Sequence, residues 1–262
     1  MQNFESFESK YCESYVAFID LLGFSNIIIK ATHEKNFSEI TSLIKKMNFL
    51  KSSIESTYGG EKVKCKLLSD SFIISSARNK SGLVNAFIMS QMLYANLISK
   101  GYLVRGGLDL GFYYQDGDAV IGTALINAYR LKSSVAKMPR LIIGQNVKND
   151  ISGILVKSHN LHDRVEEDDD GEVILKPFHW ISEYIQRLHN MSFLKLSYEE
   201  ADRYKDAVYI RNMLIEKLNK AENQSQLEKV AWLVRRFNRD CIDSTAGLNI
   251  EWLEPISLPS RP

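Results

Sequence analysis

The sequence predicts an α+β fold, an α/β sandwich whose first half follows the order β-α-β-β-α-β of a ferredoxin-like sheet. Apolar strand segments alternate with amphipathic helical patterns from residue 15 to residue 144, and turn residues separate them. The chain has 262 residues and 45% hydrophobic content, enough to bury a full core. We expect a core over residues 1–150, with a further helix and strand added, and an extension over residues 151–262.

A strand, a helical segment and a hairpin open the core. We expect the strand over residues 15–22, the helical segment over 24–56 with a break near 32–33, and the hairpin strands over 63–68 and 72–76. Gly23 turns the chain after the first strand. The connection Ser69-Asp70-Ser71 forms the hairpin tip, so we expect Asp70 to lie exposed on a turn.

A helix, a long strand, a second helix and a short strand complete the core. We expect them over residues 81–100, 102–114, 123–137 and 140–144. Ser81 caps the first of these helices, and Gly101 stops it. The glycines of the long strand indicate bending or the close approach of another backbone.

The extension differs in character from the core. A solvated acidic turn over residues 166–171 precedes a short strand over 172–175. Two long, charged, amphipathic helices follow over residues 198–220 and 224–241. We expect these helices to pack on the core or on the partner in a dimer.

Charge and composition exclude several classes of partner. The 33 basic and 32 acidic residues leave a formal charge of +1, so no broad field attracts nucleic acid or a membrane surface. No apolar run approaches the roughly 20 residues of a membrane span, and no signal peptide is evident, so we expect a soluble, cytoplasmic protein. Cys12, Cys65 and Cys241 lie far apart and fit neither disulfides nor zinc, so we expect buried free thiols.

Two aspartates lie among apolar strand residues, Asp20 after Phe18-Ile19 and Asp70 before Phe72-Ile73. A carboxylate in such surroundings needs a hydrogen-bond donor, a cation or a metal. If the two strands are neighbours, the carboxylates repel each other, and a divalent metal that carries a triphosphate makes the arrangement favourable. The alternative is that Asp20 caps a helix and Asp70 is an ordinary turn residue.

The backbone after Asp20 is suited to phosphate binding. The N–H groups from Leu22 to Ser25, across Gly23 and Phe24, lie where a strand gives way to a helix N-terminus, a natural cradle for β- and γ-phosphates. Strand periodicity places Phe18 on the face of Asp20, where its ring packs either against ribose or base or in the core. Two arginines, Arg105 and Arg140, are further candidates for phosphate contact, and a structural salt bridge is the alternative for Arg140.

Four segments resemble, in order, the motifs of class III nucleotidyl cyclases. They are Phe18-Ile19-Asp20-Leu21-Leu22-Gly23-Phe24-Ser25, Lys66-Leu67-Leu68-Ser69-Asp70-Ser71-Phe72, Val104-Arg105-Gly106-Gly107-Leu108-Asp109-Leu110-Gly111, and Gly122 through Ala128-Tyr129-Arg130-Leu131. Residues 122–131 and 138–143, the acidic turn and the last helix with Trp232-Leu233 also resemble the bacterial pyrimidine cyclases of anti-phage Pycsar systems.

The resemblance implies a catalytic core over residues 1–150 with two Mn²⁺ or Mg²⁺ ions in each site. Asp20, Asp70 and the Leu21 carbonyl would hold these ions. Arg130 would stabilise the transition state, with a solvent-facing arginine as the alternative. Asn127 would orient the ribose, although it lies three residues before Arg130 where the family has four, a displacement of about 100° around a helix.

Lys66 matches the position that reads the base in cyclases that use adenine, and its alternatives are phosphate and solvent. The resemblance further implies a homodimer with composite sites, because the chain has one copy of each motif. The substrate would be UTP or CTP, and the cyclic UMP or cyclic CMP formed would activate a separate effector in anti-phage defence.

Two other functions stay open. The first is a purine cyclase that uses ATP or GTP, which Lys66 favours and the displaced Asn127 opposes. The second is a catalytically inactive, cyclase-like nucleotide sensor or dimerisation module, which the presence of both aspartates opposes.

Overall fold

The computed structural model describes residues 11–57, 63–116, 119–153, 161–181, 198–242 and 255–259. Contacts divide the chain into two units, residues 1–93 with 103–175, and residues 94–102 with 176–262. The domain boundary that we expect near residue 150 stays a prediction.

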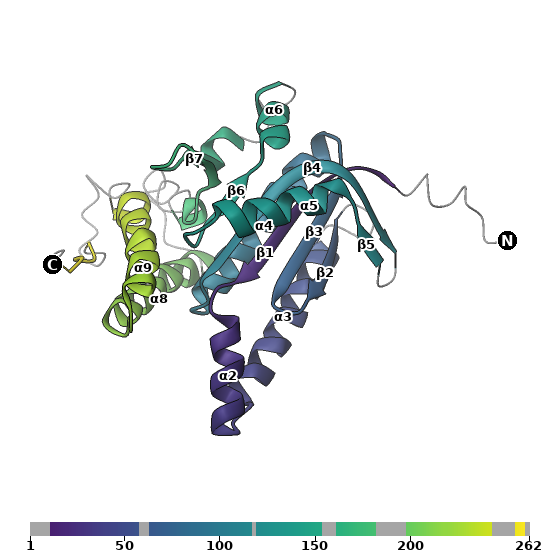
Figure 1. Cartoon of the computed structure of the whole chain (residues 1–262). Coiled ribbons are helices and arrows are strands. Elements are labelled where there is room, and N and C mark those ends of the chain that lie inside the picture. Colours follow the sequence, from purple (N-terminus) through teal and green to yellow (C-terminus); the bar gives the residue numbers. More distant parts are fainter. Residues whose placement is uncertain are drawn as a thin grey trace. The chain divides into compact units, whose positions relative to one another are not determined.

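The first unit is built on one mixed β-sheet (Figure 1). Its strands are β1 (Cys12–Leu21), β2 (Lys64–Leu68), β3 (Ser71–Ala77), β4 (Val104–Asp116), β5 (Ala119–Ile121), β6 (Leu141–Ile143), β7 (Val165–Glu167) and β8 (Val173–Leu175). In the described part of the chain their order is β2-β3-β1-β4-β6-β8-β7, and β5 pairs with β4. The first four strands pair antiparallel, as a ferredoxin-like sheet requires, and β6 joins β4 in parallel. The expected α+β fold and the β-α-β-β-α-β order of elements along the chain are confirmed.

The helices depart from expectation in three places. The first unit has α2 (Phe24–Glu34), α3 (Ser38–Thr57), the start of α4 (Lys80–Ser99), α5 (Thr123–Arg130), a π-helical turn over Leu131–Val135, and α6 (Gln145–Gly153). The break in the first helical segment falls after Lys35, whose φ of 52° is left-handed, and not at residues 32–33. The cap of α4 is Asn79, whose side chain accepts a hydrogen bond from the Gly82 amide, and not Ser81. The helix expected over residues 123–137 ends at Arg130, as α5, and continues only as the π-turn.

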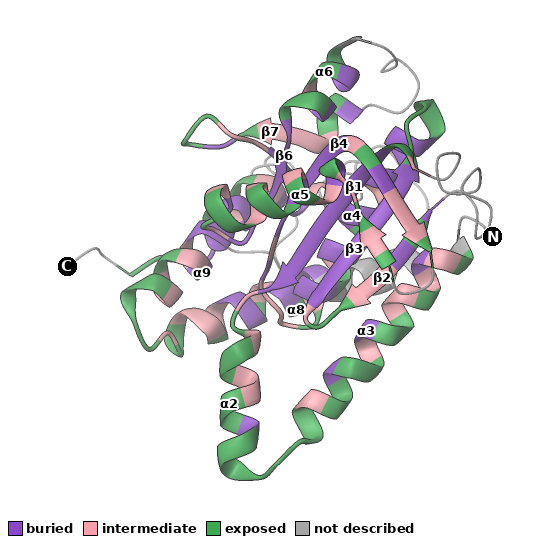
Figure 2. Cartoon of the chain, turned by 45° about the vertical axis from the view of Figure 1, so that its right-hand side comes forward, coloured by how far each residue is buried: buried purple, intermediate pink, exposed green. Residues whose placement is uncertain are grey.

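Strand β1 is an inner strand of the sheet and is buried along most of its length (Figure 2). Residues 14–21 are all buried, and the strand pairs with β3 on one side and β4 on the other. On one face, Val16 and Phe18 form a cluster with Ala124 and Ala128 of α5. Helix α5 therefore covers the face of β1 on which the even-numbered residues lie.

Glycines in β4 allow α5 to lie directly on the strand. A Cβ atom on Gly107 would be 2.5 Å from the Ala128 carbonyl oxygen and 2.5 Å from the Leu131 Cβ. A Cβ on Gly111 would be 2.7 Å from the Thr123 hydroxyl oxygen. These separations confirm the predicted close backbone approach and fix where α5 and the π-turn begin.

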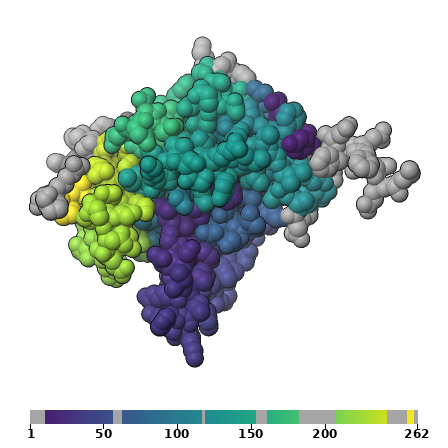
Figure 3. All heavy atoms as spheres, viewed as in Figure 1, coloured from purple at the N-terminus to yellow at the C-terminus, as the bar shows by residue number. Residues whose placement is uncertain are grey.

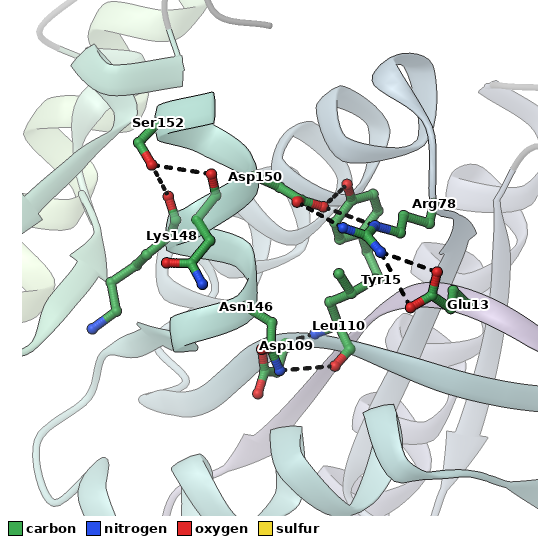
Figure 4. A network of polar contacts seen from close by, with 10 residues as sticks. Glu13, Tyr15, Arg78, Asp109, Leu110, Asn146, Lys148, Asp150 and Ser152 are labelled. Carbon is green, nitrogen blue, oxygen red and sulfur yellow. Dashed lines mark hydrogen bonds and ion pairs between the residues drawn. The ribbon is translucent and has the colours of Figure 1, made fainter. Parts of the chain in front are cut away.

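A polar network attaches α6 to the sheet (Figure 4). Arg78 donates to Asp150 and to Glu13, and the Tyr15 hydroxyl donates to Asp150 over 2.7 Å. Asp109 accepts a hydrogen bond from its neighbouring amide and lies at the N-terminus of α6, where burial nevertheless raises the pKa of this carboxyl. In the register of β1, this network lies toward the end of the strand opposite Asp20. Its role is therefore structural.

Helices α2 and α3 extend beyond the sheet, as the space-filling view shows (Figure 3). They contact each other, and only a few of their side chains are buried, among them Ala31, Leu43 and Met47. Large apolar side chains such as Ile29 and Phe49 are exposed on this pair. The pair therefore contributes little to the core of the sheet.

The second unit contains the two long helices expected of the extension, α8 (Tyr198–Asn219) and α9 (Gln224–Phe237), followed by a π-turn over Asn238–Ile242. The Phe178 and Phe237 rings meet edge to face at 5.4 Å. The Asn238 amide exchanges two hydrogen bonds of 2.9 Å with the backbone of Ile256.

The cysteines are free thiols, as expected, but they are not all buried. Cys65 and Cys241 are buried, and burial raises the pKa of the Cys65 thiol to about 12. Cys12 is exposed, because it begins β1 ahead of the buried residues 14–21. None of the helices in the described part of the chain combines the length and the apolarity that crossing a membrane requires.

Candidate metal and nucleotide site

Asp20 and Asp70 meet at one end of the β1–β3 pair. Asp20 lies opposite Ser71 in the register, and Asp70 immediately precedes Ser71 in the turn between β2 and β3. The Leu21 amide donates a hydrogen bond of 3.2 Å to the Asp70 carbonyl oxygen, which fixes the turn against the end of β1. The two strands are therefore neighbours, as the electrostatic argument from the sequence requires.

The two carboxyls interact. Burial raises the pKa of Asp70, and the Asp20 carboxyl beside it raises that pKa further. Asp70 lies on the expected turn, but it is half-buried and not fully exposed. Mutual repulsion between two partly desolvated carboxylates favours a shared proton or a cation at this position.

Asp20 forms ion pairs with two cationic side chains of the same chain. Its side chain is 6% exposed, and Oδ2 lies 2.9 Å from the Lys132 Nζ and 3.3 Å from the Arg105 Nε. The buried charge is thus compensated without any helix cap. The N-cap of α2 is Gly23, with no side-chain bond, so the alternative of Asp20 as a helix cap is wrong.

Lys132 is a site residue that the sequence reasoning missed. It stands in the π-turn, and its ammonium lies 5.3 Å from the centroid of the Phe18 ring and 5.0 Å from that of Tyr129. The two rings meet edge to face at 5.4 Å. No local pattern distinguishes Lys132 from other helical lysines, because its partners come from β1 and from the preceding turn.

Phe18 serves the core and the site together. It is buried in the cluster beneath α5, and its ring also contacts the Lys132 ammonium. The register places Lys66 and Phe18 on either side of Ile73, in one row across the sheet. Residues in one row share a face, so Lys66, Phe18 and Asp20 all lie on the face that α5 covers in part. The role of Lys66 in reading the base stays a prediction.

Fewer backbone amides are available to bind phosphate than the sequence predicts. The Leu22 amide donates to the Leu103 carbonyl oxygen over 2.8 Å, so it is not available to a phosphate, and this part of the prediction is wrong. Gly23 adopts a left-handed φ of 80°, which glycine tolerates, and α2 begins at Phe24. The remaining candidates are the amides of Gly23, Phe24 and Ser25 at the helix N-terminus.

Asn127 and Arg130 lie on α5, Asn127 half-buried and Arg130 exposed at the last position. Within the described residues of this single chain, no hydrogen bond or ion pair joins either side chain to Asp20 or Asp70. Their proposed roles are therefore untested by contacts inside one chain.

Arg140 has a structural role. Its guanidinium is buried and pairs with Asp168 and Asp170, so the salt-bridge alternative holds for this residue and a phosphate contact does not. The same contacts correct the expectation of a wholly solvated acidic turn, because Asp168 is buried by its pairing with Arg140.

The side chains that could bind a divalent cation at this site are the two carboxylates of Asp20 and Asp70. Across the described ranges, no group of three or more His, Cys, Asp or Glu side chains gathers in a way that could hold a metal ion. Two adjacent carboxylates, one of them with a raised pKa, nonetheless match the oxygen ligands that Mg²⁺ and Mn²⁺ prefer. Mg²⁺ sites commonly use one or two carboxylates and complete the shell with water and substrate phosphates.

Comparisons with known proteins give no family model that matches the sequence and no match among the curated proteins. Among solved structures, the chain is similar to a class III adenylyl cyclase-like ATP-binding protein from Pseudomonas aeruginosa, with 14% identity and a TM-score of 0.40. That similarity covers 53% of this chain and 34% of the other, so the chain matches about a third of that protein's length.

Two further structures are similar. The catalytic core of a rhodopsin-guanylyl cyclase with converted specificity, in complex with ATPalphaS, has 14% identity and a TM-score of 0.43, covering 63% of this chain and 96% of the other. A bacterial light-regulated adenylyl cyclase has 16% identity and a TM-score of 0.43, covering 77% and 57%. Similarities this low give no information about the activity of this chain.

Proposed function

We propose that this chain is a metal-dependent nucleotidyl cyclase that converts UTP or CTP into the cyclic 3',5'-monophosphate and pyrophosphate. The observation that carries the proposal is the meeting of Asp20 and Asp70 beside the N-terminus of α2. Adjacent carboxylates attract a divalent cation, and the free amides of a helix N-terminus attract an anion. A nucleoside triphosphate with its bound metal supplies both.

Asp20, Asp70 and the Leu21 carbonyl would hold two Mn²⁺ or Mg²⁺ ions. When bound, such ions lower the pKa of the attacking hydroxyl and neutralise charge on the leaving pyrophosphate. The chain's own groups hold the substrate. The amides of Gly23, Phe24 and Ser25 bind the β- and γ-phosphates, and the ring of Phe18, which is 6% exposed, offers a small apolar surface to ribose or base.

The reaction needs the ribose 3'-hydroxyl next to the α-phosphorus of the same nucleotide. Attack forms the new P–O bond, breaks the bond to the β-phosphate oxygen and releases the hydroxyl proton to solvent. The task of the protein is to hold this bent substrate and to stabilise spreading charge. Arg130 is exposed on α5 and free to reach a neighbouring molecule.

A homodimer would bring an arginine to the site to stabilise the transition state. In this arrangement Asp20 and Asp70 of one protomer face Arg130 and Asn127 of the partner subunit, which gives two equivalent composite sites. The cyclic nucleotide would act as a second messenger on a separate effector in anti-phage defence. The proposed location is the cytoplasm.

A second candidate is a nucleotide-binding module without catalysis. The specific observation in its favour is that Lys132 and Arg105 already neutralise Asp20, so this carboxylate is satisfied without a metal. Such a module would bind a triphosphate through the α2 N-terminus and leave it intact.

The test is to incubate the full chain with each of the four ribonucleoside triphosphates and Mn²⁺, and to identify products by mass. Cyclic UMP or cyclic CMP, absent with Asp20→Asn and Asp70→Asn but present with the exposed control Asp163→Asn, supports the proposal. A cyclic purine product alone would refute the pyrimidine assignment. Binding of a triphosphate without product would support the inactive module.

A further inference from the structure

We propose that Lys132 is the resident counter-ion of Asp20 in the nucleotide-free protein and that it weakens the binding of a divalent metal until a triphosphate arrives. The inference deepens the proposed function and rests on it, because it concerns the same carboxylates.

The ion pair between Lys132 and Asp20 lies in a poorly solvated position. The Nζ–Oδ2 distance is 2.9 Å, and the side chains are 12% and 6% exposed. By contrast, the helical pair Lys220–Glu216 is 74% and 62% exposed. Attraction between opposite charges is much stronger where water does not screen it, so the first pair holds its ammonium firmly and the second does not.

Two aromatic rings add to the hold on the ammonium. Phe18 and Tyr129 present rings to Lys132 Nζ at centroid distances of 5.3 and 5.0 Å, within the range of a cation–π contact. The ammonium therefore has one carboxylate and two ring faces or edges around it. This is a built position for a single positive charge, beside the carboxylate that the proposed metal requires.

The backbone explains why Lys132 reaches this position. Residue 131 packs against Gly107, where no side chain could fit between them. The chain then continues as a π-turn, the wider form of helix that often occurs at functional sites. Lysine has four rotatable methylene groups, so the ammonium can leave Asp20 without any movement of the π-turn.

A metal ion and the ammonium compete for the same oxygen of Asp20. Without nucleotide the ammonium holds the site, and Asp70 alone offers a weak ligand set. A bound triphosphate offers the Lys132 ammonium a second anion, which leaves Asp20 paired with Arg105 at the longer distance of 3.3 Å and opens the carboxylate to the metal. The metal and the nucleotide therefore bind with positive coupling, since each is favoured by the departure of Lys132 from Asp20.

The experiment measures Mn²⁺ affinity of the nucleotide-free full chain by electron paramagnetic resonance, in which only free Mn²⁺ gives the sharp signal. Lys132→Met removes the charge and keeps the length of the side chain. We expect it to bind Mn²⁺ about tenfold more tightly than the unaltered chain. Lys132→Arg, which keeps the charge, and Lys137→Met, an exposed lysine in the same region, should match the unaltered chain.

Equal Mn²⁺ affinity of Lys132→Met and the unaltered chain would overturn the inference while leaving the proposed function intact. Mn²⁺ binding that persists in Asp20→Asn would contradict the metal site itself, and with it the proposed function. If Lys132→Met does not fold, Lys132→Gln serves in its place, because its amide can still donate to Asp20, and the same tightening is expected.

Discussion

The Leu21 amide donates a hydrogen bond of 3.2 Å to the Asp70 carbonyl oxygen, and so ties the end of β1 to the turn between β2 and β3. The bond uses no side chain, yet it holds the turn that carries Asp70 against the strand that carries Asp20. Because backbone atoms make it, substitution of either aspartate should leave the turn in place. Variants at Asp20 and Asp70 therefore report on charge and not on folding of the turn.

Asp70→Asn should have opposite effects on the free and the metal-bound protein. Burial and the neighbouring Asp20 carboxyl together raise the Asp70 pKa, so its ionised form is destabilising; the change removes this charge, and the melting temperature without metal should rise at pH 7. The stabilisation that added Mn²⁺ gives the unaltered chain should disappear, and product formation should fall about 100-fold or more. Thermal melts with and without Mn²⁺, alongside the product assay, measure both effects. A melting temperature that drops without metal would contradict the repulsion.

Gly107→Ala should destabilise the fold and disturb the site. The new Cβ would lie 2.5 Å from the Ala128 carbonyl oxygen and from the Leu131 Cβ, so α5 and the π-turn must shift. Such overpacking costs about 1–3 kcal/mol and moves Lys132 away from Asp20. Urea unfolding measures the cost. Gly171→Ala is the matched control: its φ of 81° is left-handed and nothing lies within 4 Å of the new Cβ, so only a backbone cost of about 1–2 kcal/mol is expected.

Arg140→Met should damage stability and spare the site. The substitution leaves the buried Asp168 without its cation, and breaking a buried pair costs about 3–5 kcal/mol. The affinity for Mn²⁺ at Asp20 and Asp70 should not change at temperatures where the variant is folded. Lys220→Met, which breaks an exposed pair with Glu216, should leave the unfolding free energy nearly unchanged. A large loss of triphosphate affinity in folded Arg140→Met would instead restore Arg140 as a phosphate contact.

The Asp150 carboxyl should make stability depend on pH in the acid range. Burial alone would raise its pKa, but hydrogen bonds from Arg78 and Tyr15 outweigh burial and lower it. A carboxyl whose pKa is lower in the folded state contributes stability that is fully present above its unfolded pKa of about 3.9 and is lost as pH falls through the folded pKa. Asp150→Asn should therefore be less stable than the unaltered chain at pH 6, and the gap should shrink below pH of about 4. Urea unfolding from pH 6 to pH 3 tests this, and a gap that widens in acid would contradict it.

Mixed dimers should recover activity if the sites are composite. Asp70→Asn and Arg130→Ala should each be inactive alone, because each removes one half of every site. In an equal mixture, half of the dimers pair the two variants and have one intact site, so about a quarter of the normal activity should return. The product assay on separate and mixed proteins measures this, with size measurements in solution to follow the dimer. No recovery from a mixture that forms mixed dimers would show that one chain builds the whole site.

The local pattern of the sequence determined the order of strands and helices and the position of both aspartates. Alternation of apolar residues, together with Gly23, Gly101 and the turn at Ser69-Asp70, set the elements, because these signals act over a few residues. The glycines of β4 also indicated the close approach of another backbone, since their lack of a side chain is visible in the sequence itself. What local signals located less well were element ends, such as the cap of α4 and the break after α2.

Only the tertiary structure decided which charges meet. Lys132 reaches Asp20 because α5 lies on Gly107 and the π-turn follows. Arg140 does not contribute to the site because its guanidinium pairs with Asp168 and Asp170. The Leu22 amide likewise donates its hydrogen bond to the Leu103 carbonyl oxygen, because two segments that are distant in the sequence lie together in the fold. Partners of a charged group depend on sheet register and on helix packing over long stretches of chain, and no short pattern records them. The sequence placed one carboxylate near the end of a strand and the other on a turn, and the fold supplied the cations that pair with the first.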